Sequence, residues 1–178
     1  MPSTLPDYLA PHLEIVFVGI NPGAYSAQVG HYFASPRNRF WAAVKAAGLV
    51  DASLGPESDY TILMYHMGLT DLVKRPSASA SQIRPSEFRE GAPVLKAKLL
   101  SYQPRIACFH GMTAFSPFAL FALNRRGPFS LGLQPSTLGE TRLFVVPNPS
   151  PANAAFSLKV LISWYRKLKE LRDQLTRP

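Results

Sequence analysis

Residues 15–23 read Ile15-Val16-Phe17-Val18-Gly19-Ile20-Asn21-Pro22-Gly23. The first five are apolar or glycine, which is typical of a strand buried on both faces of a parallel sheet. The strand must end near Asn21, because Pro22 disfavours a helical Asn21 and has no N–H for a sheet ladder. Ligands of open α/β sheets bind beyond the carboxyl ends of the strands, so the Asn21 amide is a candidate site group. An ordinary Asn-Pro-Gly turn is the alternative interpretation.

A second stretch near the other end of the chain repeats this arrangement. Residues 143–151 read Leu143-Phe144-Val145-Val146-Pro147-Asn148-Pro149-Ser150-Pro151. Again a hydrophobic strand ends at Asn-Pro. Two strands that end in this way predict two loops meeting over one cleft, with Asn21 on one side and Asn148 on the other.

Composition indicates a globular protein with a polyanionic partner. The 178 residues are 47% hydrophobic and 17% charged, which excludes a disordered chain and predicts a single domain over 1–178. Lys and Arg number 19 against 11 Asp and Glu, so the formal net charge is +8. This charge favours nucleic acid as a partner, although a basic surface without such a role would look the same.

Cysteine content and local patterns exclude several classes of site. Cys108 is the one cysteine, so the chain has no internal disulfide and no cysteine-based zinc or iron–sulfur site. Residues 1–12 lack a secretion signal, and the apolar run 115–123 is too short to span a bilayer. We therefore expect a cytoplasmic, nucleoid-associated monomer that does not bind membranes. No phosphate-binding loop or metal-ligand spacing is present, so we expect no cofactor and no metal.

Strands alternating with helices predict a mainly parallel sheet covered on both sides. The expected strands cover residues 15–19, 68–73, 105–109, 129–133 and 141–146. The expected helices cover residues 37–47, 56–67, 85–102, 112–123 and 157–175. Pro93 and Pro117 fall inside two of these helices and are expected to kink or break them.

Two connections carry further candidate groups. The loop 21–36 contains aromatic residues that either cover the core or stack on a flat ligand. The segment 74–84 is basic and rich in Ser and Ala, so it is a candidate mobile loop that contacts phosphates or is simply solvated. Asp71 lies among apolar neighbours, either as a solvated carboxylate or as a buried group with a task.

Four short motifs follow one another along the chain. They are Gly19-Ile20-Asn21-Pro22-Gly23, Phe33-Ala34-x-Pro36-x-Asn38-Arg39-Phe40-Trp41, Gly68-Leu69-Thr70-x-Leu72-Val73-x-Arg75-Pro76 and Pro147-Asn148-Pro149-Ser150. In this order and spacing the chain resembles the mismatch-specific uracil/thymine-DNA glycosylases of the uracil-DNA glycosylase superfamily, over about residues 14–170. Each motif alone is weak, and their order makes the resemblance specific.

The resemblance implies a three-layer α/β/α sandwich and a monofunctional base-excision enzyme. Such an enzyme cleaves the N-glycosidic bond of uracil in double-stranded DNA, favouring mismatches with guanine, without a metal or cofactor. Asn21 occupies the position that holds the attacking water, and Phe33 that of the ring which stacks on the everted base. The implied substrate-binding residues are Ile20, Gly23, Ser26, Phe33 and Asn148. The implied DNA contacts are Lys74, Arg75, Ser150, Pro151, Ala152 and Asn153, the last four within the loop 148–154 that enters the minor groove.

Two departures from the family pattern carry predictions. The family usually has Gly-Leu, then Ser or an equivalent, then Arg in this loop, where the chain has Pro151 to Ala154. Because Ala152 is a poor wedge, we expect a looser dependence on the opposite base, with single-stranded DNA as a further candidate substrate.

Asp71 stands where the family commonly has Lys or Asn. A carboxylate there could activate the water held by Asn21, or could point away and pair with Lys74 or Arg75.

Two other function classes fit parts of the sequence. A non-catalytic DNA-binding module that senses lesions or mismatches would use the same basic surface and aromatic loop. An α/β hydrolase of small nucleotides is disfavoured by the missing phosphate-binding motifs. Formation of alkali-labile abasic sites in uracil-containing DNA distinguishes a glycosylase from both.

Overall fold

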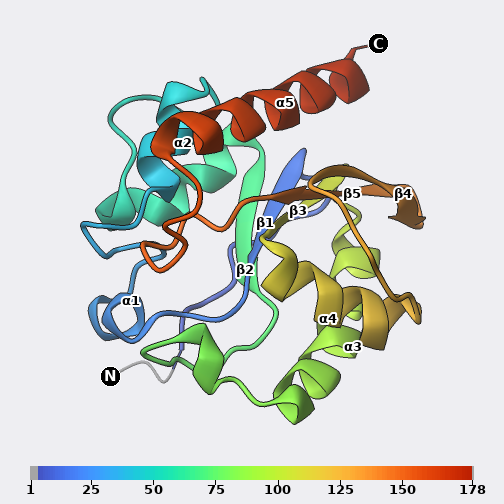
Figure 1. Ribbon diagram of the computed structural model, residues 1–178. Coiled ribbons are helices and arrows are strands. Elements are labelled where there is room, and N and C mark those ends of the chain that lie inside the picture. Colours follow the sequence, from blue (N-terminus) through green and yellow to red (C-terminus); the bar gives the residue numbers. More distant parts are fainter. Residues whose placement is uncertain (1–3, 178) are drawn as a thin grey trace.

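The computed structural model describes residues 4–177 and arranges them around a five-stranded sheet (Figure 1). The strands are β1 (Ile15–Gly19), β2 (Met67–Asp71), β3 (Ile106–His110), β4 (Gly132–Leu138) and β5 (Thr141–Val146). Their order across the sheet is β2-β1-β3-β5-β4. Neighbouring strands are parallel except β4, which is antiparallel to β5. The predicted mainly parallel sheet is confirmed.

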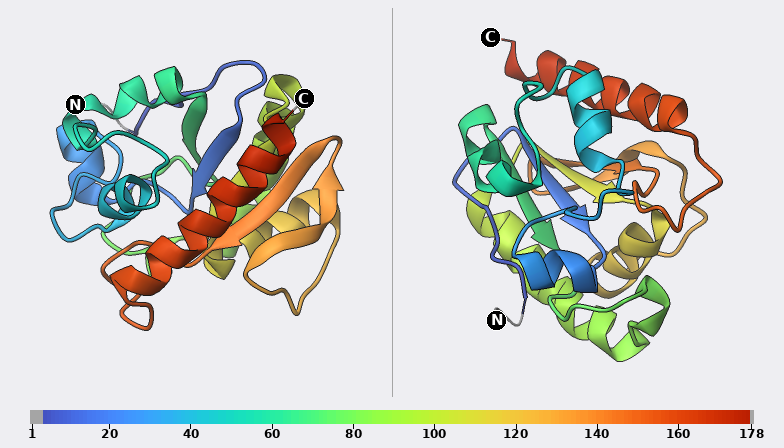
Figure 2. Two further views of the ribbon diagram at one scale, coloured as in Figure 1. Left: turned by 90° about the horizontal axis from the view of Figure 1, so that it is seen from above. Right: turned by 90° about the vertical axis from the view of Figure 1, so that its left-hand side faces the viewer.

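Helices cover both faces of this sheet. The helices are α1 (Ala24–Val29), α2 (Phe40–Ala46), α3 (Pro85–Tyr102), α4 (Met112–Leu123) and α5 (Leu158–Thr176), with the 3₁₀ helices η1 (Pro56–Tyr65) and η2 (Ala80–Gln82). Helices α2 and α5 and the 3₁₀ helix η1 lie on one face, and α3 and α4 on the other (Figures 1 and 2). The chain therefore has the three-layer α/β/α architecture that the resemblance implied. No helix within residues 4–177 is both long and apolar enough to cross a membrane.

The two cores follow from the strand pattern of β1. Successive side chains of a strand point to opposite faces, so Ile15 and Phe17 face one core while Val16 and Val18 face the other. All four are essentially inaccessible to solvent. Full burial of such a side chain contributes roughly 1.5–3 kcal/mol, which explains why the whole strand is apolar.

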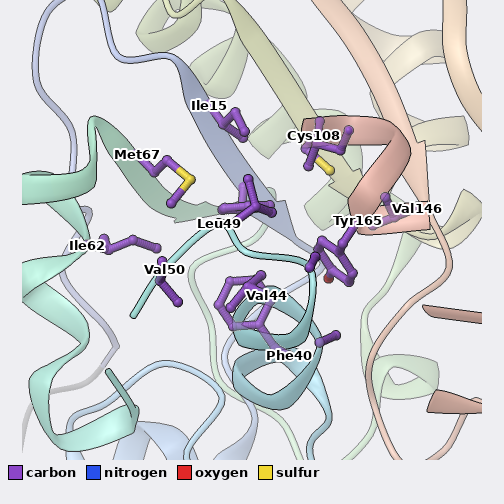
Figure 3. Packing of buried hydrophobic residues seen from close by; sticks show 14 of the residues in the cluster. Ile15, Phe40, Val44, Leu49, Val50, Ile62, Met67, Cys108, Val146 and Tyr165 are labelled. Carbon is purple, nitrogen blue, oxygen red and sulfur yellow. The ribbon is translucent and has the colours of Figure 1, made fainter. Parts of the chain in front are cut away.

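Helices α2 and α5 meet over the first of these cores. Figure 3 shows Phe40 and Val44 of α2 close to Tyr165 of α5, all directed toward the strands. The rings of Phe40 and Phe17 meet edge to face with centroids 5.2 Å apart. This packing fixes the start of α2 against the end of β1, beside the candidate site.

The outer edge of β2 is covered by the N-terminal segment. Tyr8 and Leu69 exchange two backbone hydrogen bonds, of 2.9 and 3.0 Å, in an antiparallel bridge. The polar backbone groups of this edge are thus partly satisfied within the chain.

Several predicted elements differ from those observed. The expected breaks at Pro93 and Pro117 are absent, since both prolines lie inside continuous helices, α3 and α4. A proline removes one backbone hydrogen bond, and packing on the sheet retains both helices. Residues 56–65 form a 3₁₀ helix with a kink at Ser58. The loop 21–36 contains the helix α1, which is too short for an apolar period to reveal.

The strand predicted at residues 129–133 is wrong. The observed strand β4 begins at Gly132, includes Pro135 and ends at Leu138, so it overlaps the predicted strand only at residues 132–133. Proline is tolerated here because β4 is an edge strand and its register with β5 is irregular between Leu133 and Thr137.

Gly91 of α3 should be intolerant of a side chain. An added Cβ would overlap the carbonyl oxygen of Leu72, the residue that follows β2. In an ordinary helix Gly→Ala stabilises by about 1 kcal/mol, but here we expect Gly91→Ala to destabilise the protein by about 1–3 kcal/mol. Urea unfolding measures this, with Ser101→Ala in the exposed last turn of α3 as control. A stabilised Gly91→Ala would show that α3 is not in close contact with this backbone.

Candidate active site

The strand ends bring four polar side chains to one edge of the sheet. Asp71 and His110 are the last residues of β2 and β3, while Asn21 and Asn148 lie two residues beyond β1 and β5. Gly19 is in register with Asp71, and His110 with Val146. Both asparagine loops therefore leave the same edge of the sheet, with only β3 between their strands, and the cleft between them stays a prediction.

The side chain of Asn21 is held by the segment that follows β2. Its Nδ2 donates to the carbonyl oxygen of Arg75 at 2.9 Å and to Ser77 Oγ at 2.8 Å, with a longer contact to Pro22 O. The backbones of Pro22 and Ser77 are also hydrogen-bonded, at 3.1 Å. With the amide nitrogen bound in this way, Oδ1 is the atom of Asn21 that remains to orient a ligand or water.

Asp71 is buried at the neighbouring strand end. Asp71 is 5% exposed, and its Oδ2 is buried without a hydrogen-bond partner among residues 4–177. Gly19 makes room for the carboxylate, because a Cβ at that position would collide with Asp71 Oδ1. Burial raises the pKa of Asp71 to about 7; Lys74 opposes this rise and the charge of Asp7 adds to it. A carboxyl group with a pKa near neutrality is suited to proton transfer.

The alternative of a solvated Asp71 paired with Lys74 or Arg75 is wrong. Lys74 Nζ binds Asp7 Oδ1 at 2.8 Å, and Arg75 binds Glu87, with Nη2 and Oε2 3.0 Å apart. Both cations are therefore engaged by other carboxylates. Their contact with DNA phosphates stays a prediction, and the segment 74–84 is held to α3 through Glu87.

Phe33 lies on the same side of the sheet as Asp71. Its backbone is in the left-handed region, with φ of 54°, which is uncommon for a bulky residue. Its half-buried ring stacks on Phe40, with centroids 4.1 Å apart, and lies 5.3 Å from the His110 ring. The buried carboxylate of Asp59 stabilises this turn by accepting the Tyr32 N–H at 2.8 Å.

His110 also lies at this edge, although no motif in the sequence identified it as a site residue. It is 1% exposed, and its Nε2 lies 3.1 Å from the Tyr165 hydroxyl. Its Nδ1 is buried and has no hydrogen-bond partner in the described part of the chain. Burial lowers the pKa of His110 to about 3, so the ring is neutral at physiological pH. Its position as the last residue of a buried strand, like Asp71, was the signal that could have identified it.

The remaining predicted substrate-binding residues occupy the loop around Asn21. Ile20 is buried and its carbonyl accepts the Val73 N–H at 2.9 Å. Gly23 is exposed and bridges to Ser77. Ser26 is buried, and its Oγ accepts the Ala34 N–H at 3.0 Å, so this hydroxyl already holds the Phe33 turn.

The predicted DNA-contacting loop follows β5 and returns to α5. Asn148 packs against Gly111, where an added Cβ would lie 3.2 Å from Asn148 Cβ. Asn148 Oδ1 accepts the Ser150 N–H, and Asn153 Nδ2 donates to the Asn148 carbonyl, both at 3.0 Å. Pro151 and Ala152 form the exposed tip.

Two hollows open on the surface, and the smaller one is lined in part by the candidate site residues Asp71, Lys74 and Arg75. One of about 310 Å³ lies between the end of β2 and α3, and one of about 600 Å³ lies between α4 and β4. A base pocket between Phe33 and β1 stays a prediction. Within residues 4–177, no three His, Cys, Asp or Glu side chains are grouped as metal ligands would be.

Comparison with known proteins identifies the family. The family model "Uracil DNA glycosylase superfamily" matches residues 6–169. A solution NMR structure from Methanosarcina acetivorans, described as a "putative Uracil DNA glycosylase", is similar with a TM-score of 0.60 and 24% identity. The match covers 94% of this chain and 98% of that one, and at this identity it supports the fold. The family model spans nearly the whole chain, and the protein therefore belongs to the uracil DNA glycosylase superfamily.

Proposed function

We propose that the protein is a monofunctional DNA glycosylase that everts uracil from DNA and hydrolyses its N-glycosidic bond. Membership of the superfamily supports uracil excision in general. The observation that carries the proposal is the pair Asn21 and Asp71 at neighbouring strand ends. Within the described residues the amide oxygen of Asn21 has no hydrogen-bond partner, and the carboxylate of Asp71 is buried. Membership of the mismatch-specific subfamily is part of the proposal, but the preference for guanine opposite uracil that the resemblance implied is not, because the 148–154 loop departs from the family pattern.

The proposed chemistry divides the work between these two side chains. Bond breaking leaves positive charge on the sugar and negative charge on the departing base. Asn21 Oδ1 orients the water, but an amide is a poor proton acceptor. The Asp71 carboxylate is the better base, and its ionised form also stabilises the cationic sugar. Neither step requires a metal or a cofactor.

The protein must offset the free-energy cost of moving the base out of the duplex. Unstacking and unpairing a nucleotide costs a few kcal/mol. Stacking on an aromatic ring such as Phe33 recovers about 1–3 kcal/mol. The net charge of +8 supplies attraction to phosphates that weakens as the salt concentration rises.

The first experiment compares Asn21→Ala with Asp71→Ala. We expect each to reduce single-turnover release of uracil by about 10²–10⁴-fold, because each removes one half of the water-activating pair. Binding to uracil-containing DNA, measured by gel shift, is retained. Asp51→Ala, which removes an exposed carboxylate elsewhere, is the control. Near-normal turnover by Asp71→Ala would rule out its catalytic role, and DNA binding without any release by the unmodified protein would favour a lesion-sensing module.

Because the pKa of Asp71 is raised, we expect activity to increase and the free energy of unfolding to decrease as the pH rises toward 7. Activity should rise about tenfold per pH unit up to about pH 7 and then level, because the ionised carboxyl is the base. The pKa of Asp71 is higher in the folded than in the unfolded protein. Its contribution to the free energy of unfolding is therefore most favourable below about pH 4 and is lost as the pH rises through about 7. Asp71→Asn should therefore be inactive yet more stable at pH 8, by on the order of 2 kcal/mol. Equal stability of the two proteins at pH 8 would mean that the carboxylate is not desolvated.

The tip of the 148–154 loop predicts a weak dependence on the opposite base. Pro151 lacks a donor and Ala152 has little surface to wedge between base pairs, so neither reads the orphaned base well. We expect rates within about threefold on U·G, U·A and single-stranded substrates. Single-turnover assays on the three substrates decide this, and a strong preference for U·G would refute it. Release of thymine from T·G is measured in the same series.

A further inference from the structure

Arg39 connects the start of α2 with the loop that follows β5. Its backbone N–H donates to Pro149 O at 3.2 Å. Its guanidinium donates to Ser150 O at 3.1 Å, to Asn153 O at 3.0 Å and to Phe156 O, with a longer contact to Pro149 O. Four carbonyl groups of the segment 149–156 therefore converge on one side chain. Figure 1 shows this orange-red loop beside the blue connection that leads into α2.

This use of Arg39 depends on the shape of the guanidinium. The group carries five N–H donors in a fixed plane and can serve several acceptors at once, whereas a lysine ammonium is a compact point charge. Within residues 4–177 no carboxylate is paired with Arg39, so carbonyl dipoles are its main partners. A half-buried cation with only carbonyl partners organises backbone rather than neutralising an acid.

The same turn of α2 also supports the stacking ring. Phe40, the next residue, packs on Phe33 with centroids 4.1 Å apart. Trp41 donates its indole N–H to Tyr32 O at 3.0 Å. Residues 39–41 thus hold the Phe33 turn on one side and the 149–156 loop on the other. The separation between these two parts is fixed by the first turn of one helix.

We propose that Arg39 is a positioning residue that gives the 149–156 loop the shape needed to occupy the gap left by an everted base. The proposal rests on the proposed function, since the gap arises only when a base leaves a duplex. A uracil in single-stranded DNA leaves no such gap. Arg39 therefore matters for excision from duplex DNA and much less for excision from single strands.

The activity test compares Arg39→Met and Arg39→Lys with Arg37→Met. Arg37 is exposed and makes no hydrogen bond in the described part of the chain, so its variant controls for the lost charge. Single-turnover uracil release is measured on a U·G duplex and on the same strand alone. We expect Arg39→Met to lower the duplex rate by roughly 10²-fold while the single-strand rate changes by less than about threefold. Arg39→Lys should have a duplex rate nearly as low as that of Arg39→Met, because a lysine cannot serve several carbonyl groups at once. Arg37→Met should leave both rates within about twofold of those of the unmodified protein.

Hydrogen–deuterium exchange of the amides of residues 150–156 provides a readout independent of activity. We expect exchange at least about tenfold faster in Arg39→Met and unchanged in Arg37→Met. An equal loss of activity on the two substrates, or unchanged exchange in Arg39→Met, overturns the proposal. If the unmodified protein releases no uracil, the proposed function fails, and exchange alone still decides whether Arg39 orders the loop.

Discussion

The site depends on the burial of one carboxylate between two parallel strands. Asp71 ends β2 in register with Gly19 of β1, and the missing side chain of that glycine leaves the space in which the carboxylate lies. Burying a carboxylate with an unpartnered oxygen costs several kcal/mol unless it is protonated. An uncharged residue in place of Asp71 would give a more stable fold. A buried carboxylate that lowers stability in this way is typical of a functional group.

The cations near this carboxylate are bound by other acidic side chains instead of pairing with it. Lys74 and Lys98 both bind Asp7, at 2.8 and 2.6 Å, and Arg75 binds Glu87. If one of these cations reached Asp71, the pKa of its carboxyl would fall and the group would become a weaker base. The same segment also provides the carbonyl and hydroxyl groups that bind the Asn21 amide. Residues 71–77 thus set the chemistry of both candidate catalytic groups.

The parallel sheet and its polar edge were predictable because they follow from local rules. A fully apolar strand ending at Asn21-Pro22 indicates both burial and direction, and parallel strands bring such ends together. Asp59 and Arg39 could not be found in this way, since each acts on backbone groups distant in sequence: Asp59 on Tyr32 and Arg39 on the 149–156 loop. Likewise the bounds of β4 were predicted wrongly, because only its edge position permits Pro135 and neighbouring strands are unknown before the fold is known.

The two outer strands have a consequence for behaviour at high concentration. Unpaired edges of a sheet are where separate molecules add strand to strand and begin to aggregate. Here one edge is occupied by Tyr8 and the other is interrupted by Pro135 and a shifted register. Neither edge offers an unbroken row of donors and acceptors to a neighbouring copy. For a basic protein such edges limit strand-to-strand addition between copies even where they are crowded together.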